Sequence, residues 1–319
     1  MLILDSGRTL YYGEGNVFVY RTYAKPLEVI PIPESPFTGE SNVIFAHNVT
    51  FSVSGESLLA SYTEGDNSQI VSTDSMKNFI LQHAAWFEGG TTEGLLAFIG
   101  NKFLSTYLHF DAVKLNAVRI PFQAFATPGP GGFYDNRLVF RRSNNDHSSA
   151  QMEIRRSGSD TQVSVHWCAL SDLQLVKVSG NRFFGFIRDE YTTLPEAKDR
   201  PLLLQLDILW RYENAQDAIS QEYGRYTTAE QIRDIAQNVF YESDTPSILY
   251  LIWLIGQRIL TRFPQLAEVR FESKNKTWET VVEPMERGLP GVYTEPSPHF
   301  GFQGFSMTKA DLITGPQAR

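Results

Sequence analysis

Strand and helix patterns follow one another in the same order twice along this chain, and this repetition constrains its fold more than any other feature. In the first half, strand-like stretches lie at 16–22 and 49–65, helical stretches at 72–90 and 91–110, and further strands at 112–122, 137–142 and 149–156. In the second half, the corresponding strands lie at 183–187 and 201–212, the helices at 227–243 and 244–260, and the last strands at 266–272 and 277–282. Two such units predict an α+β fold of antiparallel sheets with helices on one face.

The spacing of apolar residues distinguishes the helices from the strands. Met76 and Ile80 recur at a helical interval, whereas Leu204, Leu206 and Ile208 alternate along a strand. The segment "TPGPGG" at 127–132 is a loop by composition. The residues expected to cap helices are Thr73, Asp74 and Ser75 for the first, Thr227 with Glu230 for the third, and Thr245 with Pro246 for the fourth.

Charge and cysteine content narrow the classes of function. The chain has 319 residues, a formal net charge of −8 and one cysteine, Cys168. A negative chain is a poor match for a phosphate backbone, so we expect no nucleic-acid partner. One cysteine forms neither an internal disulfide nor a cysteine cluster for a metal, which indicates a reducing compartment. Without a secretory or membrane-spanning pattern, we predict a cytoplasmic protein with no membrane partner.

The stretch "YYGEGNVFVYRTYAKPL" places a carboxylate between two glycines. Gly13 and Gly15 flank Glu14, and Val17 and Val19 alternate after them. We therefore expect the chain to turn into a strand here, with Glu14 at the turn. An acidic side chain at a turn between two glycines requires an explanation.

Several longer motifs resemble urate oxidases, most closely those of the Bacillus type. These motifs are "YTEGDNSQIVSTDSMKNF", "GFIRDEYTTLPEAKDR" and "FGFQGFSM", and the resemblance runs from Tyr11 to Leu312. It implies the tunnelling fold (T-fold), with tandem units at 10–158 and 159–312 and a tail at 313–319. It also implies that pairs of subunits close β-barrels, usually in a homotetramer with active sites between subunits.

The resemblance further implies a reaction without metal or organic cofactor. Urate oxidases convert urate and O2 into 5-hydroxyisourate and H2O2. The planar purine anion must be held flat, deprotonated further and kept beside dioxygen. The protein has to achieve this by shape, hydrogen bonds and proton transfer alone.

Matched residue by residue, the resemblance assigns roles in both halves of the chain. Thr73 matches the threonine of the proton relay, and Asp74 offers a backbone N–H to the purine edge. Phe183 matches the aromatic ring on which urate stacks, and Arg200 matches the guanidinium that grips the purine. Asn275 matches the asparagine whose amide faces the dioxygen or water site.

Two positions depart from the family pattern. Glu14 stands where the family has a lysine that acts with the relay threonine, and Leu249 stands where a glutamine pairs with the arginine on the purine. The resemblance also implies that Ile248, beside Leu249, contacts the substrate, and Thr277 stands where many members have a histidine. An acid at the lysine position turns attraction for an anionic purine into repulsion, and leucine makes no hydrogen bond to it.

Three functions remain open at this point. The chain is a working urate oxidase if water, another lysine or a protonated Glu14 compensates for the missing lysine. It is a catalytically impaired relative if it keeps the barrel and a purine-sized pocket as a binding or scaffold protein. It is a different tunnelling-fold enzyme if Glu14 acts as general base on a neutral purine-like or pterin-like substrate. Taken alone, Leu249 reads as ordinary core packing.

Overall fold

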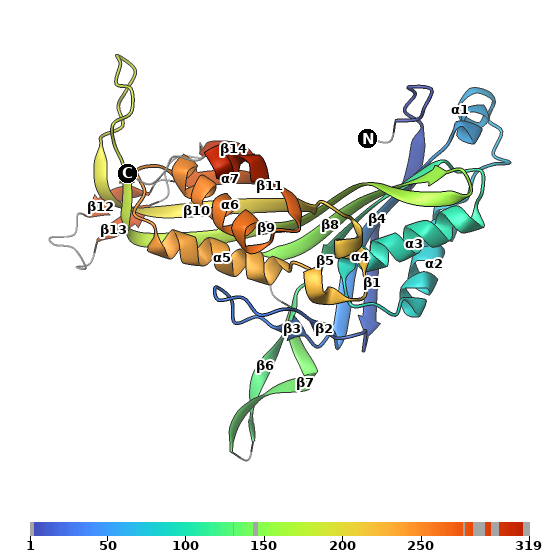
Figure 1. Ribbon diagram of the computed structural model, residues 1–319, viewed down its shortest axis with the longest axis horizontal. Coiled ribbons are helices and arrows are strands. Elements are labelled where there is room, and N and C mark those ends of the chain that lie inside the picture. The colour runs from blue at the N-terminus through green and yellow to red at the C-terminus, as the bar shows by residue number, and fades with distance from the viewer. Residues whose placement is uncertain are drawn as a thin grey trace. The chain divides into compact units, whose positions relative to one another are not determined.

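The computed structural model describes residues 3–129, 131–142, 146–276, 278–282, 291–294 and 300–314 (Figure 1). Its elements form two compact units. The first unit comprises residues 1–31, 37–169 and 211–227, and the second comprises residues 32–36, 170–210 and 228–319. The long strands β9 and β10 each contribute residues to both units.

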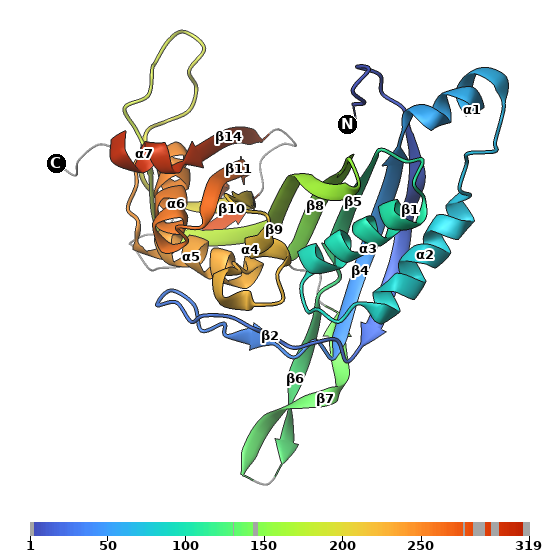
Figure 2. The same ribbon diagram turned by 45° about the vertical axis from the view of Figure 1, so that its right-hand side comes forward.

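The first unit is a sheet covered on one face by two helices. Its strands hydrogen-bond in the order β1 (Tyr11–Thr22), β4 (Ile44–Ser54), β5 (Ala112–Arg119), β8 (His147–Ser157) and β9 (Asp160–Phe183). Helices α2 (Thr73–Trp86) and α3 (Thr92–Thr106) lie against these strands (Figure 2). The helices and the sheet face that they cover supply the buried core, which includes Phe51, Leu96, Phe103, Val113 and Ile154.

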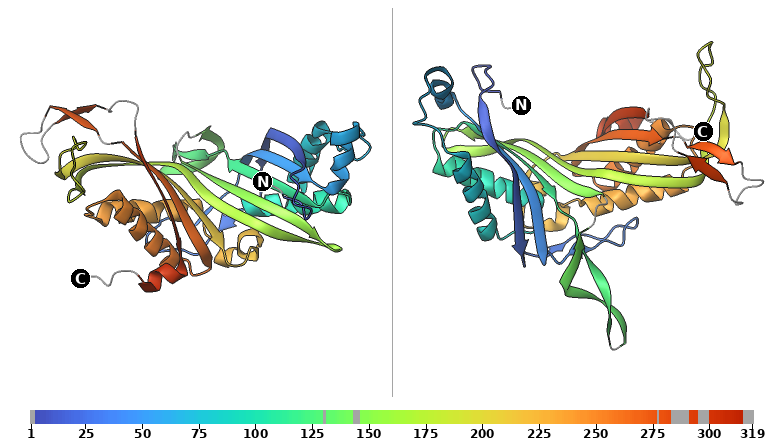
Figure 3. Two further views of the ribbon diagram at one scale, coloured as in Figure 1. Left: turned by 90° about the horizontal axis from the view of Figure 1, so that it is seen from above. Right: turned by 180° about the vertical axis from the view of Figure 1, so that it is seen from behind.

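The second unit repeats this arrangement. Its strands hydrogen-bond in the order β9, β10 (Ala197–Tyr212), β11 (Leu266–Lys276) and β14 (Gly301–Thr308). Helices α5 (Ala229–Glu242) and α6 (Ile248–Arg262) lie on one face of these strands, and in the view from behind they lie beyond the strands (Figure 3). Alternate strand residues face the helices, so the buried side chains include Leu204, Ile208, Trp210, Ile252 and Phe271.

The remaining strands lie outside the eight-stranded sheet, and the remaining helices are short. They are β2 (Leu27–Glu28), β3 (Gly39–Glu40), β6 (Phe122–Gly129), β7 (Gly132–Arg142), β12 (Glu279–Val282), β13 (Val292–Thr294), α1 (Leu59–Glu64), α4 (Gln216–Ile219) and α7 (Lys309–Thr314). Two 3-10 turns lie at Glu56–Leu58 and Tyr223–Arg225. Among the described helices, none combines the length and apolar character needed to span a bilayer.

The predicted fold class is confirmed, and the predicted order of elements holds except for the last strand of the second half. With only the strands of the eight-stranded sheet and the helices α2, α3, α5 and α6 counted, the chain runs β1, β4, α2, α3, β5, β8 and then β9, β10, α5, α6, β11, β14. This is an α+β fold with antiparallel strand pairs, as the sequence predicts. The division into units at residue 158 stays a prediction, because the compact units share β9 and β10.

Several predictions from the sequence pattern are wrong in detail. The strand predicted at 49–65 ends at Ser54, and Leu59–Glu64 form α1. The strand predicted at 277–282 contributes β12, which pairs with β13 outside the eight-stranded sheet, and β14 is the last strand of that sheet. β9 spans 24 residues and ends at Phe183, whereas the sequence pattern places a strand at 183–187. Polar residues such as His166, Asp172 and Lys177 interrupt the apolar alternation along β9, so its pattern is weak. The "TPGPGG" segment belongs mostly to a hairpin, since β6 ends at Gly129 and β7 begins at Gly132.

The predicted helix caps are also displaced. Ser72 caps α2, so Thr73 is the first helical residue rather than the cap. Thr228 caps α5, and Ser247 caps α6. Each of these residues has an extended backbone and a side-chain oxygen that accepts an N–H from the first turn, and neighbouring Ser and Thr residues are indistinguishable by type alone.

His47 is a fully buried titratable group in the first unit. Its Nε2 lies 2.9 Å from the hydroxyl oxygen of Thr92, and its Nδ1 has no hydrogen-bond partner in the described part of the chain. Burial, and secondarily the charge of Arg119, lowers the pKa of His47 to about 3. The ring is therefore neutral in the folded protein at neutral pH.

Acidification should destabilise the first unit through His47. Below about pH 6.5 the unfolded chain takes up a proton at His47 that the folded chain does not, so the free energy of unfolding falls by about 1.4 kcal/mol per pH unit. This loss continues until the pH reaches the folded pKa of about 3. Thermal melts between pH 7 and 4 should show a steeper loss for the native chain than for His47→Gln. Equal slopes would contradict the assignment.

Candidate functional site

Glu14 lies inside a strand and not at a turn, so the predicted turn is wrong. It stands opposite Phe51 in the antiparallel pair of β1 and β4, and the register shifts between Glu14 and Val17. Asn16, within this β-bulge, has a φ of 57°. Gly13 is required by packing, because a Cβ atom there would overlap the carbonyl oxygen of Phe51. The glycine-flanked motif therefore encodes a bulged strand that directs the side chain of residue 14.

Thr73 and Asp74 occupy the first turn of α2. Ser72 caps the helix by accepting the N–H of Ser75 at 3.1 Å. The backbone N–H groups of Thr73 and Asp74 lie at the open end of the helix, where no preceding carbonyl is available to them. Both side chains are exposed. Such a helix end favours an anionic group through its N–H donors and the helix dipole.

Lys77, which the sequence analysis did not single out, adds an ammonium group here. Its Nζ lies 2.5 Å from Oδ1 of Asp74, and Asn78 donates to Oδ2 of Asp74 at 3.1 Å. The pKa of Lys77 is raised most strongly by the hydrogen bond that Lys77 donates to Asp74, then by the charge of Asp74, and also by the charge of Glu14. The same hydrogen bond lowers the pKa of Asp74. Lys77 stands one helical turn after Thr73, and that spacing is the signal that could have revealed it.

We call Glu14, Thr73, Asp74 and Lys77 the α2 cluster. It combines a hydroxyl, an ammonium, two carboxylates and free helix N–H positions within the first unit. Such a set can bind one edge of an anion and move a proton at that edge.

In the second unit, side-chain contacts join three segments. Arg182, at the end of β9, forms an ion pair with Asp244 in the loop before α6. Near the start of β10, Asp199 accepts the N–H of Gly180 at 2.5 Å. The segments brought together in this way carry the predicted site residues Phe183, Arg200, Ile248 and Leu249.

Phe183, which the sequence predicts as the residue that stacks on the purine, lies at the end of β9. Phe183 is half-buried, and its ring stacks on Phe186 with centroids 4.7 Å apart and planes 13° apart. A stacked pair provides a flat, firmly held apolar layer. Arg200 lies in β10, but its side chain is outside the described part of the structure, as is the whole of Thr277.

Leu249 is not a core residue. It is the second residue of α6 and is 63% exposed, whereas Ile248 before it is half-buried. Ser247 caps α6 by accepting the N–H of Tyr250 at 3.2 Å. The interpretation of Leu249 as ordinary core packing is therefore wrong. Its place at the start of α6 resembles that of Asp74 in α2.

Asn275 belongs to a short hydrogen-bonded row near the end of β11. It stands opposite Gly301 of β14, and its Oδ1 accepts a hydrogen bond from Nε2 of Gln303 at 2.8 Å. The hydroxyl of Ser273 donates to Oε1 of Gln303 at 2.7 Å. Ser273 is 2% exposed, so one end of this row is buried.

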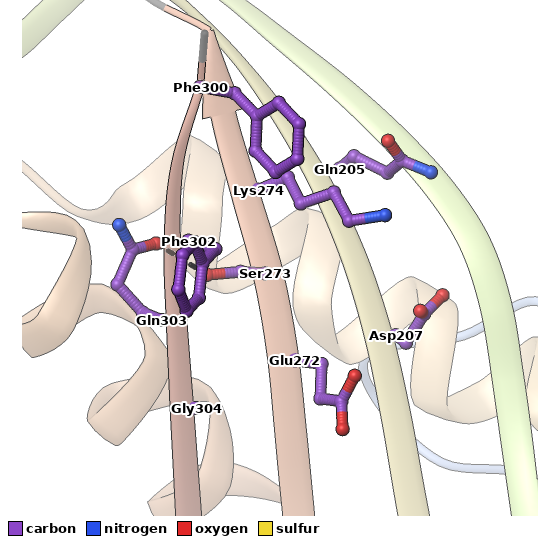
Figure 4. A pocket seen from close by; sticks show the side chains of 9 residues that line it. All are labelled: Gln205, Asp207, Glu272, Ser273, Lys274, Phe300, Phe302, Gln303 and Gly304. Atoms are coloured by element: carbon purple, nitrogen blue, oxygen red, sulfur yellow. Dashed lines mark hydrogen bonds between the residues drawn. The ribbon is translucent and has the colours of Figure 1, made fainter.

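A pocket of about 390 Å³ lies beside the same two strands. Figure 4 shows Lys274 and Glu272 extending away from Gln303, toward Gln205 and Asp207 of β10. None of the predicted site residues lines this pocket. In the described part of the chain, no group of three or more His, Cys, Asp or Glu side chains is placed to hold a metal ion.

Comparison with protein families and curated proteins gives a consistent result. The family model described as uricase matches residues 40–156 and 168–303. The uric acid degradation bifunctional protein PucL of Bacillus subtilis is 51% identical over 305 residues, covering 95% of this chain and 62% of its own length. The uricase of Halalkalicoccus jeotgali is 45% identical over 302 residues, covering 94% and 98%. The chain thus spans less than two thirds of the bifunctional relative.

Solved structures of uricases also resemble the chain. A uricase from Bacillus fastidious has a TM-score of 0.94 at 50% identity, with 96% of each chain covered. The urate oxidase of Bacillus subtilis 168 has a TM-score of 0.81 at 44% identity, covering 95% of this chain and 100% of its own.

Proposed function

This chain belongs to the uricase family, and we propose that it binds urate and oxidises it with dioxygen. Its α+β architecture is that of the solved uricases, the tunnelling fold. In the proposed reaction the purine gives two electrons to O2, which takes up two protons and leaves as H2O2. A water molecule supplies the hydroxyl of 5-hydroxyisourate, so atoms and electrons balance without a cofactor.

The observation that carries the proposal is the cation in the α2 cluster. Lys77 keeps a positive charge beside Thr73 although the family lysine is replaced by Glu14. The N–H groups at the start of α2 would bind the purine edge, and the Lys77 charge would offset that of the anion. Thr73 would pass the purine proton to Glu14, whose carboxylate would act as the base and become a neutral acid, while Lys77 stays paired with Asp74.

The second unit would supply the flat surface and the remaining contacts. Phe183 would stack on the purine ring, and Arg200 would bind it bidentately. Asn275 would face dioxygen above the ring. Leu249 would leave one edge of the purine without a hydrogen-bond partner, which predicts weaker binding than a glutamine would give.

We further propose that the sites form between subunits of a homo-oligomer, in keeping with the family. The edge strands of the eight-stranded sheet, β1 and β14, support assembly, because both carry exposed aromatic side chains. Phe18 and Tyr20 on β1 are 48% and 57% exposed, and Phe302 on β14 is 79% exposed. Edge strands with such side chains favour pairing with another chain. Light scattering of the purified protein should give a multiple of the chain mass, and a stable monomer would contradict this.

A cytoplasmic location remains part of the proposal, and fractionation of the native cells tests it.

The test of function combines turnover with binding. Dioxygen consumption and H2O2 release are measured after urate is added, and urate binding is measured separately without oxygen. Turnover supports the proposed oxidation. Binding without turnover supports the alternative of an impaired relative that holds a purine, which the exposed Leu249 at the start of α6 favours. Absence of both overturns both functions.

Lys77 has its own test. Lys77→Met should lower kcat/KM for urate at least tenfold in the native chain, because Glu14 then faces the anion with no cation beside it. In a Glu14→Lys background the same change should cost much less, since the introduced lysine carries the charge. Lys102→Met, an exposed lysine of α3, is the matched control. Equal losses in both backgrounds would contradict the compensating role.

A further inference from the structure

The C-terminal motif "FGFQGFSM" is not accounted for by the proposed contacts with the purine. From Gly301 onward it belongs to β14, whose residues pair with β11 in an antiparallel register that sets Gln303 opposite Ser273 and Gly301 opposite Asn275. Because side chains alternate along a strand, Gln303, Ser273 and Asn275 share one face. Figure 4 shows Ser273 and Gln303 joined by their hydrogen bond.

The hydrogen bonds along this row have a direction. Ser273 donates to the amide oxygen of Gln303, and the amide nitrogen of Gln303 donates to the amide oxygen of Asn275. A primary amide has one oxygen acceptor and one NH2 donor. Since its oxygen is held by Gln303, Asn275 presents its NH2 group at the outer end of the row.

Gly301 provides the space in which this amide lies. A Cβ atom at Gly301 would stand 2.7 Å from Oδ1 of Asn275 and 3.4 Å from its Cγ. Contacts this short would move the side chain of Asn275, because a side-chain end yields more readily than a strand backbone. Gly304, on the same strand, differs: among the described residues, a Cβ there would meet only the carbonyl oxygen of Phe271, at 3.9 Å.

We propose that Gln303 and Gly301 are positioning residues, which hold Asn275 with its NH2 donor toward the dioxygen site of the proposed reaction. This inference rests on the proposed function for its chemistry. As dioxygen takes up electrons it gains negative charge, and a fixed N–H donor stabilises that charge without having to reorient. If the Asn275 amide were flipped, so that its oxygen and NH2 group exchanged places, it would present its oxygen to dioxygen and repel the same charge.

Four substitutions test the positioning role. Each is made both in the native chain and in the double variant Glu14→Lys/Leu249→Gln. Gln303→Glu keeps the shape but removes the donor, so Asn275 must donate to the carboxylate and turn its oxygen outward. We expect kcat to fall about a hundredfold, the scale of one oxyanion donor, with KM for urate within about twofold. Gly301→Ala should lower kcat about tenfold. Gly304→Ala, the matched control, should match its parent, and Asn275→Ala sets the maximum loss.

The split between kcat and KM separates positioning from folding. A merely structural role would lower the melting temperature and raise KM together, and that pattern in Gln303→Glu would overturn the inference. Full activity of Gln303→Glu beside a disabled Asn275→Ala would also overturn it. The dioxygen dependence should change with kcat, whereas urate binding without oxygen should not.

Crystal structures of the variants show whether Gln303 and Gly301 position Asn275, even if no form of the chain turns over urate. In Gly301→Ala, the Asn275 side chain should be displaced from Gln303. In Gln303→Glu, the carboxylate should stay within hydrogen-bond distance of Asn275, which requires the NH2 group to face it. The positioning role fails if Asn275 keeps its place in Gly301→Ala and no longer contacts residue 303 in Gln303→Glu. Failed turnover in all forms, with both crystal results as expected, removes the proposed function and keeps the positioning.

Discussion

Changing Glu14 to lysine and Leu249 to glutamine together raises kcat/KM for urate oxidation about a thousandfold. Positioned acid and base groups contribute about a hundredfold or more, and a hydrogen bond to a charged ligand contributes about 1.5–3 kcal/mol, or roughly ten- to a hundredfold. We take the lower end of both ranges, because Lys77 already supplies part of the positive charge.

The two changes act at different places and should be close to additive. Glu14 lies in β1 of the first unit, where its charge reaches Lys77, and Leu249 lies at the start of α6 in the second unit. A lysine introduced at position 14 would not be expelled by Lys77, because Asp74 pairs with Lys77 at 2.5 Å and offsets part of its charge. A glutamine at position 249 needs no repacking, because Leu249 is already 63% exposed.

The measurement is dioxygen consumption and H2O2 release for the native chain, both single variants and the double variant. Glu64→Lys with Leu81→Gln is the matched control, since it makes the same exchanges at exposed positions outside the proposed site. Turnover by the native chain that the double variant scarcely exceeds would show that Glu14 and Leu249 do not limit the reaction. A silent native chain with an active double variant would identify a uricase scaffold whose chemistry these two residues suppress.

The order of elements was accessible from the sequence because it depends on local periodicity. Apolar residues recur at helical intervals in α2 and alternate in β10, and burial in the folded chain follows these patterns. β9 was not accessible in the same way. It passes through both units, and its polar residues weaken any single alternation.

The site residues could be predicted from the sequence only in part, because their roles depend on neighbours that the fold brings together. The motif around Thr73 identified the start of α2, but the charge on Lys77 matters only because the fold brings Glu14 of β1 near it. Likewise, Asn275 and Gln303 become partners through the register of β11 and β14, which no local pattern encodes. Residues that act through their neighbours are therefore the ones that sequence motifs leave unexplained.

Gly13→Ala should be the most damaging single substitution at the start of the chain. A Cβ atom at Gly13 would overlap the backbone oxygen of Phe51 and stand 2.7 Å from the Cα of Ser52. These are backbone atoms of β4, which yield only if the two strands move apart. We expect a loss of about 3 kcal/mol in the free energy of unfolding, at the upper end for overpacking.

Gly15→Ala is the matched control for this effect, because it lies on the other side of Glu14. A Cβ atom there would stand 3.7 Å from Oγ1 of Thr50, an ordinary contact. Urea unfolding should therefore place the midpoint of Gly13→Ala well below that of Gly15→Ala, which should stay within about 1 kcal/mol of the native chain. Equal stabilities would mean that β1 is free to shift beside β4. In that case the bulge could not fix the direction of the Glu14 side chain, and the α2 cluster would lose its structural basis.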